Sequence, residues 1–420
     1  MSVVRKSFLL FVVVIASAKV WGQAAQSPIS TYGIGEPYGN ALIHNQGMAG
    51  VGVSQPQYWF LNNQNPALLV YNGLTIFEAG VLIESRSIKS DTLTEKSQAG
   101  NMNYLATAFP IKRNKWTTSV GLMPYTNVDF AFQSVTILDD GENTKFYKRE
   151  EGLGGLTQLY WSNGVRITPD FTAGVKATYL FGSVENVYSS QLEGTSFITS
   201  ILEKTTAKDF NFSFGLSYSK DSLGTKNYRL SVGAVYSPES SMTSRRSDRF
   251  YTTTSAGDTL ASEELNNIPG EIFLPGSFTF GVSFGRGQKW SVSTEYFYQD
   301  WANFTSVNPD DVQGMGKSWR AALGGELTPD PFGDKYLKRV TYRAGVSVEQ
   351  YPFLANNNNK VKDLGASIGL SLPAGRSSLD LAFKWGKRGD KAETLLEETY
   401  FKIYFGITFN DQWFIKRKFD

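Results

Sequence analysis

The residue types that carry most enzyme and metal chemistry are scarce in this chain. Among its 420 residues there is no Cys and a single His, His44. Disulfides, thiolate metal sites and Cys nucleophiles are therefore excluded, and so is any metal site that needs two His ligands. A Ser-His-Asp triad would have to use His44, which lies in a stretch rich in Gly and Asn. We expect no enzyme activity and assign no catalytic residue.

One acidic turn has side chains that could bind a cation. The run Asp139-Asp140-Gly141-Glu142-Asn143 offers carboxylates, the ligands that Ca²⁺ prefers. The run lacks the ligand spacing of an EF-hand, so we expect a solvated turn, no metal site and no cofactor. The 41 Lys and Arg residues nearly balance the 39 Asp and Glu residues, which gives a nucleic-acid partner no electrostatic support.

Residues 1–22 are expected to be a secretory signal peptide. Arg5 and Lys6 form a short basic region, an apolar core spans 8–16, and cleavage is expected after Gly22. The apolar run is shorter than the ~20 residues that a membrane-spanning helix needs. Since no later segment is continuously apolar for that length, the exported chain would enter a membrane only as a β-barrel.

From Leu74 onward the hydrophobic pattern has a period of two. In residues 401–410 every second residue is Phe or Ile, and the residues between are Lys, Tyr, Gly, Thr and Asn. The chain is 14% aromatic, holds 40 Gly and is only 19% charged, which fits a barrel with a lipid face and a polar lumen face. A soluble β-sandwich would also alternate, but a large aromatic face opposite small residues favours the membrane barrel.

The expected strands number about fourteen. We therefore predict an all-β fold in which residues 73–420 form a transmembrane antiparallel β-barrel in the outer membrane. Short turns alternate with long connections, the arrangement of outer-membrane barrels. The long ones are expected at 127–155, 187–208, 238–276, 301–317 and 350–362. The strands are expected near 74–85, 101–111, 116–126, 156–167, 171–186, 209–219, 227–237, 277–286, 289–300, 318–327, 340–349, 363–373, 377–387 and 399–410.

Residues 23–72 do not alternate and are expected to form a plug inside the lumen. A fourteen-strand lumen is too wide for its own side chains to fill. The Gly-rich segment at 47–50, the tripeptide Asn65-Pro66-Ala67 before the first strand, and about fourteen strands together resemble the FadL-type outer-membrane transporters of hydrophobic compounds, a family that includes PorV-related barrels. The resemblance implies an N-terminal hatch with Asn65, Pro66 and Ala67 as its gate.

The resemblance implies passive transport of long-chain fatty acids or other hydrophobic small molecules across the outer membrane. Pro124 falls late in the third expected strand, where the strand ends or a kink opens a lateral exit into membrane lipid. That exit would be favourable, since a fatty acid gains ~0.8 kcal/mol per CH₂ buried in the bilayer. The long loops would form an apolar landing groove, with candidate lining residues Phe197, Ile198, Ile201, Leu202, Ile268, Ile272, Phe273 and Leu274.

Three inward bases, Arg166, Arg229 and Arg343, are candidate lumen anchors. They would meet a carboxylate head of a ligand or form ion pairs with Glu295, Glu326 and Glu349, and we expect the ion pairs.

A second hypothesis is an interaction protein that serves a secretion or outer-membrane assembly complex, as PorV-related barrels do in type IX secretion. A continuous apolar lumen would favour transport. Large ordered loops turned toward protein partners would favour the interaction protein.

Overall fold

The computed structural model describes residues 25–91, 93–139, 142–308, 314–355, 359–394 and 396–412. The expected signal peptide lies outside these ranges, as do Asp140 and Gly141 of the acidic turn. No helix among the described residues is long and apolar enough to cross a bilayer.

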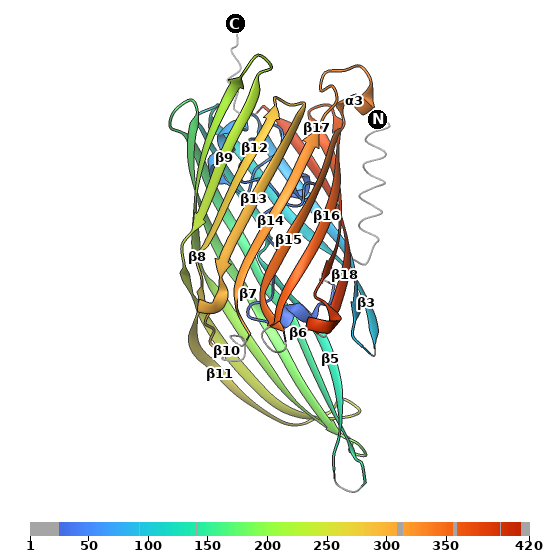
Figure 1. Cartoon of the computed structure of the whole chain (residues 1–420). Coiled ribbons are helices and arrows are strands. Elements are labelled where there is room, and N and C mark those ends of the chain that lie inside the picture. The colour runs from blue at the N-terminus through green and yellow to red at the C-terminus, as the bar shows by residue number, and fades with distance from the viewer. Residues whose placement is uncertain are drawn as a thin grey trace, which may run out of the picture.

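Fourteen antiparallel strands close into a barrel, because the last strand pairs with the first over fifteen residues of each (Figure 1). Each strand pairs with its neighbours on both sides. The fourteen are β2 (Thr75–Lys89), β3 (Thr94–Lys112), β4 (Trp116–Pro124), β6 (Lys145–Arg166), β7 (Phe171–Leu192), β8 (Phe197–Leu223), β9 (Tyr228–Ser237), β12 (Ser277–Arg286), β13 (Trp290–Asp300), β14 (Lys317–Leu327), β15 (Thr341–Ala355), β16 (Asn359–Ala374), β17 (Ser377–Arg388) and β18 (Glu397–Asp411).

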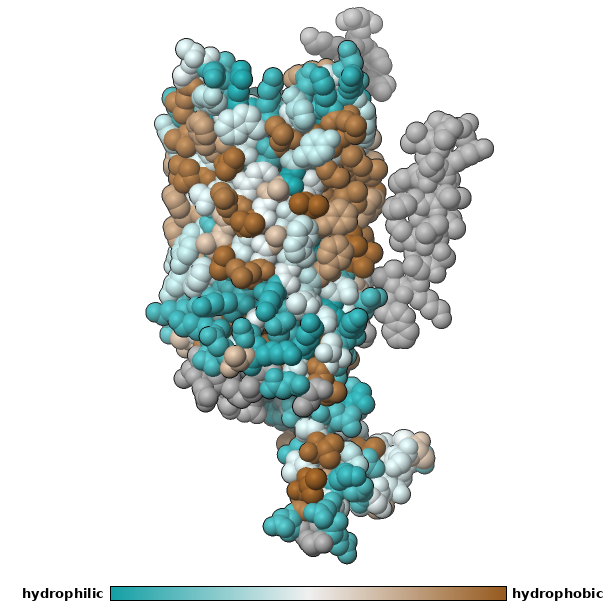
Figure 2. All heavy atoms as spheres, turned by 45° about the vertical axis from the view of Figure 1, so that its right-hand side comes forward, coloured by the Kyte–Doolittle hydropathy of each residue, from teal (hydrophilic) through white to brown (hydrophobic). Residues whose placement is uncertain are grey.

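The two faces of the barrel wall differ as the alternation predicts. In β8 the exposed side chains of Phe210, Phe212 and Phe214 point outward, while Ser217 is buried inside. On the face seen in Figure 2 a band of apolar side chains lies across the wall, and polar side chains gather at both of its ends. This is the distribution that a lipid bilayer imposes on a barrel.

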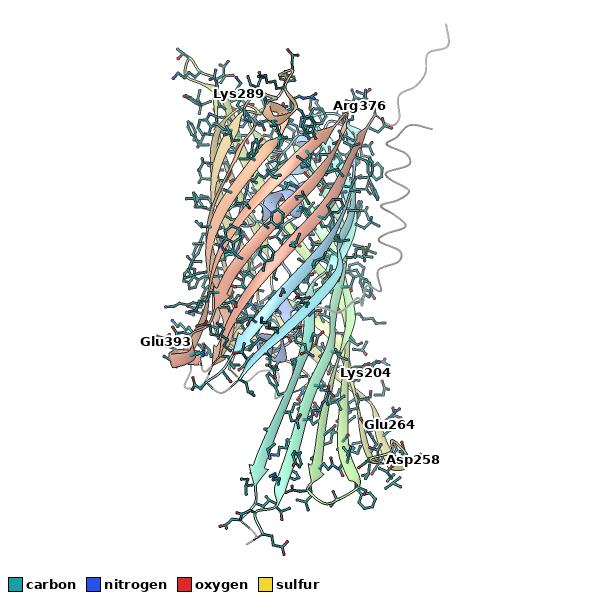
Figure 3. The ribbon with its side chains drawn as sticks, turned by 90° about the vertical axis from the view of Figure 1, so that its right-hand side faces the viewer. Lys204, Asp258, Glu264, Lys289, Arg376 and Glu393 are labelled. Carbon is teal, nitrogen blue, oxygen red and sulfur yellow. The ribbon has the colours of Figure 1, made fainter. Side chains whose placement is uncertain are left out.

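Part of the barrel continues well beyond the band as a β-sheet. Strands β6, β7 and β8 are 22, 22 and 27 residues long, whereas about 9–11 residues span a bilayer. Three further strands join their outer ends: β5 (Thr126–Ile137) pairs with β6, β10 (Ser240–Thr254) with β8, and β11 (Thr259–Leu274) with β10. We call this six-stranded sheet the extension (Figures 1 and 3).

The extension corrects the expectation of long loops at 127–155, 187–208 and 238–276. These segments are largely strand. Outside the bilayer neither face of a strand needs to be apolar, so the alternation that marks membrane strands is weak there. In Figure 3 the labelled Lys204, Asp258 and Glu264 lie on the extension, and Lys289 and Arg376 lie at the opposite end of the molecule, where the turns are short.

The N-terminal segment lies inside the barrel, where η2 contacts β6, β7 and β8, and α2 contacts β16, β17 and β18. Its residues 25–72 form only short elements, namely η1 (Pro28–Thr31), β1 (Glu36–Pro37), α2 (Ile43–Gln46) and η2 (Pro66–Tyr71). We call this segment the hatch. The remaining short elements are η3 (Trp301–Asn303), α3 (Tyr336–Arg339) and α4 (Lys391–Thr394).

A glycine neck joins the barrel to the extension. β4 ends at Pro124, and after Tyr125 the chain continues as β5 along the same partner, β6. At this point Gly154 and Gly155 of β6 have φ of 116° and 130°, conformations that L side chains rarely adopt. A Cβ on Gly155 would also overlap the carbonyl oxygen of Thr126.

We predict that Gly155→Ala loosens β5 from β6 while the barrel still forms. The added Cβ clashes with backbone at a strained φ, a change that costs roughly 1–3 kcal/mol. Hydrogen exchange of the β5 amides should accelerate, and exchange in β12–β18 should not change. Gly100→Ala is the control, because a Cβ there makes only ordinary contacts. Equal exchange of β5 in both variants would contradict the neck.

Candidate functional site

The hatch backbone lies directly against the barrel wall at glycine positions. A Cβ on Gly174 of β7 would overlap the carbonyl carbon of Pro66, and one on Gly215 of β8 would overlap the side chain of Asn65. Across the lumen, Gly345 of β15 meets Met48 in the same way. Because these strand positions carry no side chain, the wall accepts the hatch without space between them.

The Asn65-Pro66-Ala67 tripeptide ties the hatch together and to the wall. The Asn65 side chain is fully buried and accepts a hydrogen bond from the Ala67 amide at 3.0 Å, which caps η2. Its amide nitrogen donates to the carbonyl oxygens of Val53 at 2.8 Å and of Leu216 at 3.1 Å. The tripeptide is therefore a fixed joint of the hatch in this conformation, and a gating role for it is a proposal.

Glu36 is the only charged residue between positions 23 and 72. Its carboxylate is buried and forms ion pairs with Arg86 of β2 at 2.8 Å and with Arg388 of β17 at 2.9 Å. Burial alone would raise the pKa of Glu36, but Arg388 and Arg86 hold that pKa well below its ordinary value. The hatch is thus held to the wall by one ionised side chain with two cationic partners.

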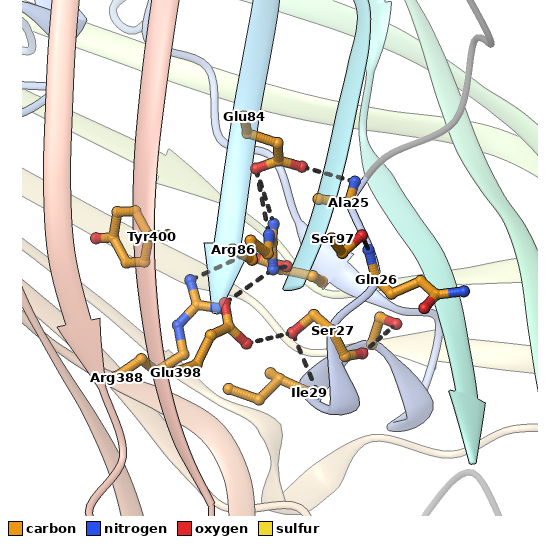
Figure 4. A network of polar contacts seen from close by, with 12 residues as sticks. Ala25, Gln26, Ser27, Ile29, Glu84, Arg86, Ser97, Arg388, Glu398 and Tyr400 are labelled. Carbon is orange, nitrogen blue, oxygen red and sulfur yellow. Dashed lines mark hydrogen bonds and ion pairs between the residues drawn. The ribbon is translucent and has the colours of Figure 1, made fainter. Parts of the chain in front are cut away.

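Further carboxylates pair directly with the two arginines (Figure 4). Glu398 of β18 lies 3.0 Å from Arg86 and also accepts a hydrogen bond from the Ser27 hydroxyl at 2.7 Å. Glu84 lies 3.1 Å from Arg86 and accepts from the Ala25 amide at 3.1 Å. The start of the hatch is therefore bound into the same network. We call this network, formed by Glu36, Glu84, Arg86, Asp363, Arg388, Glu398 and Lys402, the ion lock.

The predicted lumen anchors Arg166, Arg229 and Arg343 all hold aromatic rings of the hatch. Arg166 lies 4.8 Å from the Tyr71 ring centroid and donates to the carbonyl oxygens of Asn114 and Pro169. Arg229 lies 5.3 Å from the Tyr58 ring and pairs with Asp221. Arg343 lies 5.0 Å from the Phe60 ring and pairs with Glu326 at 3.2 Å. Their contacts are with the hatch and the wall, and Glu295 is paired instead with Arg320.

The barrel wall has a seam beside Pro124. The pairing of β3 with β4 ends at Leu105 and Leu122. Beyond that point, among the described wall strands, β3 pairs only with β2 and β5 pairs only with β6. The hatch fills this seam. Glu36 and Pro37 pair with β5, the Tyr38 amide donates to the Tyr125 carbonyl, and the Tyr38 hydroxyl donates to Asn101 of β3 at 2.8 Å.

A cavity of about 260 Å³ remains between the hatch and the wall. Its lining includes the charged side chains Glu84, Glu295, Arg320, Lys384 and Lys402. Ligand pockets for small molecules are usually about 300–1,000 Å³ and mainly apolar. The cavity in the described lumen thus has a partly charged lining, whereas transport of a fatty acid would favour a continuous apolar path.

The residues expected to line one landing groove lie in several separate places. Phe197 is exposed at the outer end of β8, and Ile201 and Leu202 point to opposite faces of the extension because they are adjacent in a strand. Ile272 and Leu274 are buried with Trp301 and Phe304 in an apolar cluster that also includes Ile34 of the hatch. Phe273 forms a backbone hydrogen bond with Thr305.

His44 is buried and its ring stacks on Phe60 at 4.9 Å. Two Gly-x-Ser-x-Gly sequences, at 281–285 and 365–369, lie in the middle of β12 and β16. A nucleophile elbow needs this sequence at a strand-to-helix turn. Ser283 bonds to Ser54 and Ser293, and Ser367 accepts from the Ala49 amide, so both serines position the hatch.

Comparison with known proteins identifies the family. A family model described as BamG matches residues 3–420. The chain belongs to the BamG family. No curated protein matches the chain at a significant level.

Several solved structures share the fold of this BamG-family chain. The Pseudomonas putida toluene transporter TodX has a TM-score of 0.57 at 14% identity, over 91% of this chain and 100% of TodX. A Pseudomonas aeruginosa FadL homologue has a TM-score of 0.57 at 12% identity, over 89% and 98%. The monoaromatic hydrocarbon channel CymD has a TM-score of 0.54 at 14% identity, over 89% and 98%. At these identities the likeness shows the fold, a transmembrane barrel of the kind found in outer-membrane channels for hydrophobic compounds. The three are described as transporters, channels or their homologues, and none as an enzyme.

We predict that Glu36→Gln releases the start of the hatch. The change removes the carboxylate charge that joins the hatch to Arg86 and Arg388, and breaking a buried ion pair costs roughly 3–5 kcal/mol. Hydrogen exchange of the amides of residues 25–38 should accelerate by at least tenfold, without a change in the barrel strands. The control is Glu397→Gln, which removes only the more exposed pair with Lys387. Unchanged exchange in Glu36→Gln would show that the ion lock does not hold the hatch.

We also predict that Gly174→Ala shifts η2 from the wall. The new Cβ occupies the position of the Pro66 carbonyl carbon, so overpacking of roughly 1–3 kcal/mol is expected. Limited chymotrypsin cleavage at Tyr71 should appear in this variant and not in wild type. Gly73→Ala is the matched control, because a Cβ there meets nothing within 4 Å. Resistance equal to wild type in Gly174→Ala would contradict the close approach.

Proposed function

We propose that this chain is an integral outer-membrane protein whose main role is to bind partner proteins, within a secretion or outer-membrane assembly complex. The observation that carries the proposal is the extension. Six strands continue beyond the barrel as ordered sheet, and a chain that only passed small molecules would have no use for so large a surface outside the bilayer.

The closed lumen supports the same role. The ion lock, the cation–π contacts to Tyr58, Phe60 and Tyr71, and the glycine contacts all hold the hatch in place. The cavity that remains is charged and small. A barrel closed in this way serves as a rigid membrane anchor for the extension.

Native mass spectrometry of the protein extracted gently from its own membrane tests the proposal. We expect the chain to carry one or more partner proteins in fixed stoichiometry, with chemical crosslinks from the partner to residues 126–208 and 240–274. A single chain that carries hydrophobic small molecules and no protein would contradict the role.

The seam favours a second candidate function, passive transport of long-chain fatty acids or other hydrophobic molecules with lateral exit. Among the described residues β3 and β5 do not pair with each other beside Pro124, and the hatch closes the opening between them. The fold shared with TodX supports this candidate in general terms. Uptake of a radiolabelled fatty acid by cells would test it: no difference between cells with and without the protein would exclude it, and normal uptake in Pro124→Val would exclude the kink.

A further inference from the structure

Three long edges in the described part of the sheet have no neighbouring strand. The outer half of β3, residues 94–103, pairs only with β2. The outer part of β5, residues 130–137, pairs only with β6. The edge of β11, residues 259–271, pairs only with β10. Open edges present unpaired N–H and C=O groups, and proteins usually protect them against other strands.

Two of these edges carry the usual protection. β11 has Glu263 and Glu264, a Pro at position 269, and a register shift near Asn267, whose φ is 69°. The edge of β3 carries charges in its Glu95-Lys96 pair. Charges, proline and bulges all oppose the addition of another strand.

The edge of β5 carries none of these features. Residues 130–137 read Phe-Ala-Phe-Gln-Ser-Val-Thr-Ile, with no charge, no Pro and no Gly. The side chains of Phe132, Val135 and Ile137 are 37%, 50% and 61% exposed. β-Branched and aromatic residues without charge are the composition that favours strand pairing.

The chain itself already uses the beginning of this edge. Glu36 pairs with Asn127, and the Ser27 amide donates to the Asp129 carbonyl at 2.9 Å. The Asp129 amide donates in turn to the Ser30 hydroxyl at 3.1 Å. The backbone of Asp129 therefore faces the open side. Since strand residues alternate, the N–H and C=O groups of Ala131, Gln133, Val135 and Ile137 face the same side.

We propose that residues 130–137 of β5 receive an extended strand of a partner protein outside the membrane, by β-strand addition. The inference rests on the proposed binding role and names how one partner would bind. Main-chain hydrogen bonds to the four outward-facing residues would supply affinity. The partner strand would be uncharged and would place apolar side chains beside Phe132 on one face and Val135 on the other. The partner strand would lie along the same open edge of β5, directly beyond the residues Asn127 and Asp129 that the hatch already covers.

Hydrogen exchange measured in two preparations tests this proposal. The first is the purified single chain in detergent, and the second is the complex extracted from its own outer membrane. We expect the amides of Ala131, Gln133, Val135 and Ile137 to exchange at least tenfold more slowly in the complex than in the single chain. Amides on the open edge of β11 serve as the internal control and should not change.

A proline variant then links the protection to strand addition. Val135→Pro removes one outward N–H, and Pro is tolerated where an edge N–H faces solvent, so the fold should persist. We expect loss of the protection at Ala131 and Gln133 in the extracted complex. Val135→Thr keeps the N–H and the β-branch and should behave as wild type.

The outcomes separate this inference from the proposed function. If partner proteins are present but the β5 amides exchange equally fast in both preparations, strand addition is overturned and the binding role stays intact. Absence of any partner would overturn both. Protection that appears in the purified chain and grows with its concentration would show a second copy on the edge and overturn the partner strand. If Val135→Pro did not fold, the comparison of the two wild-type preparations would still decide the question.

Discussion

The rest of the structure depends on the burial of one carboxylate, Glu36. A buried charge is tolerated only where partners neutralise it. The hatch has no other charge, so its position is fixed where Arg86 and Arg388 converge from strands on either side of β18. The lock in turn binds the Ser27 end of the hatch and places residues 36–38 in the seam beside β5. The ion pairs of Glu36 thus hold the hatch both in the lumen and in the seam of the wall.

The wall is shaped to receive this hatch. Glycines of the wall lie where the hatch backbone contacts the strands. Arginines of the wall lie against the aromatic rings of the hatch. Both the glycines and the arginines stand at lumen-facing positions of the strands. In a water-filled pore such positions would be polar and solvated. This BamG-family chain shares its barrel fold with the TodX and CymD structures, and its lumen is occupied by its own N-terminal segment. Outside the apolar band the same wall strands continue into the extension.

The sequence predicted the features that the membrane imposes. Every second residue in 401–410 must face lipid, so the strand count of fourteen followed from alternation, and the irregular composition of 23–72 predicted a plug. The extension was missed because water contacts both faces of its strands and relaxes the pattern. Expected loop residues such as Ile201 and Ile272 are strand residues in separate places. The ion lock depends on register between distant strands, but one signal was available: Glu36 is the only charge in fifty residues.

The central claim is that the ion lock keeps the barrel closed. The most direct measurement is ionic conductance of the purified protein in planar bilayers, with wild type compared with a variant that carries Arg86→Ala and Arg388→Ala. The account predicts that wild type is silent and that the double variant opens channels as the hatch leaves its site. A wild-type protein that conducts as a stable open pore would contradict it.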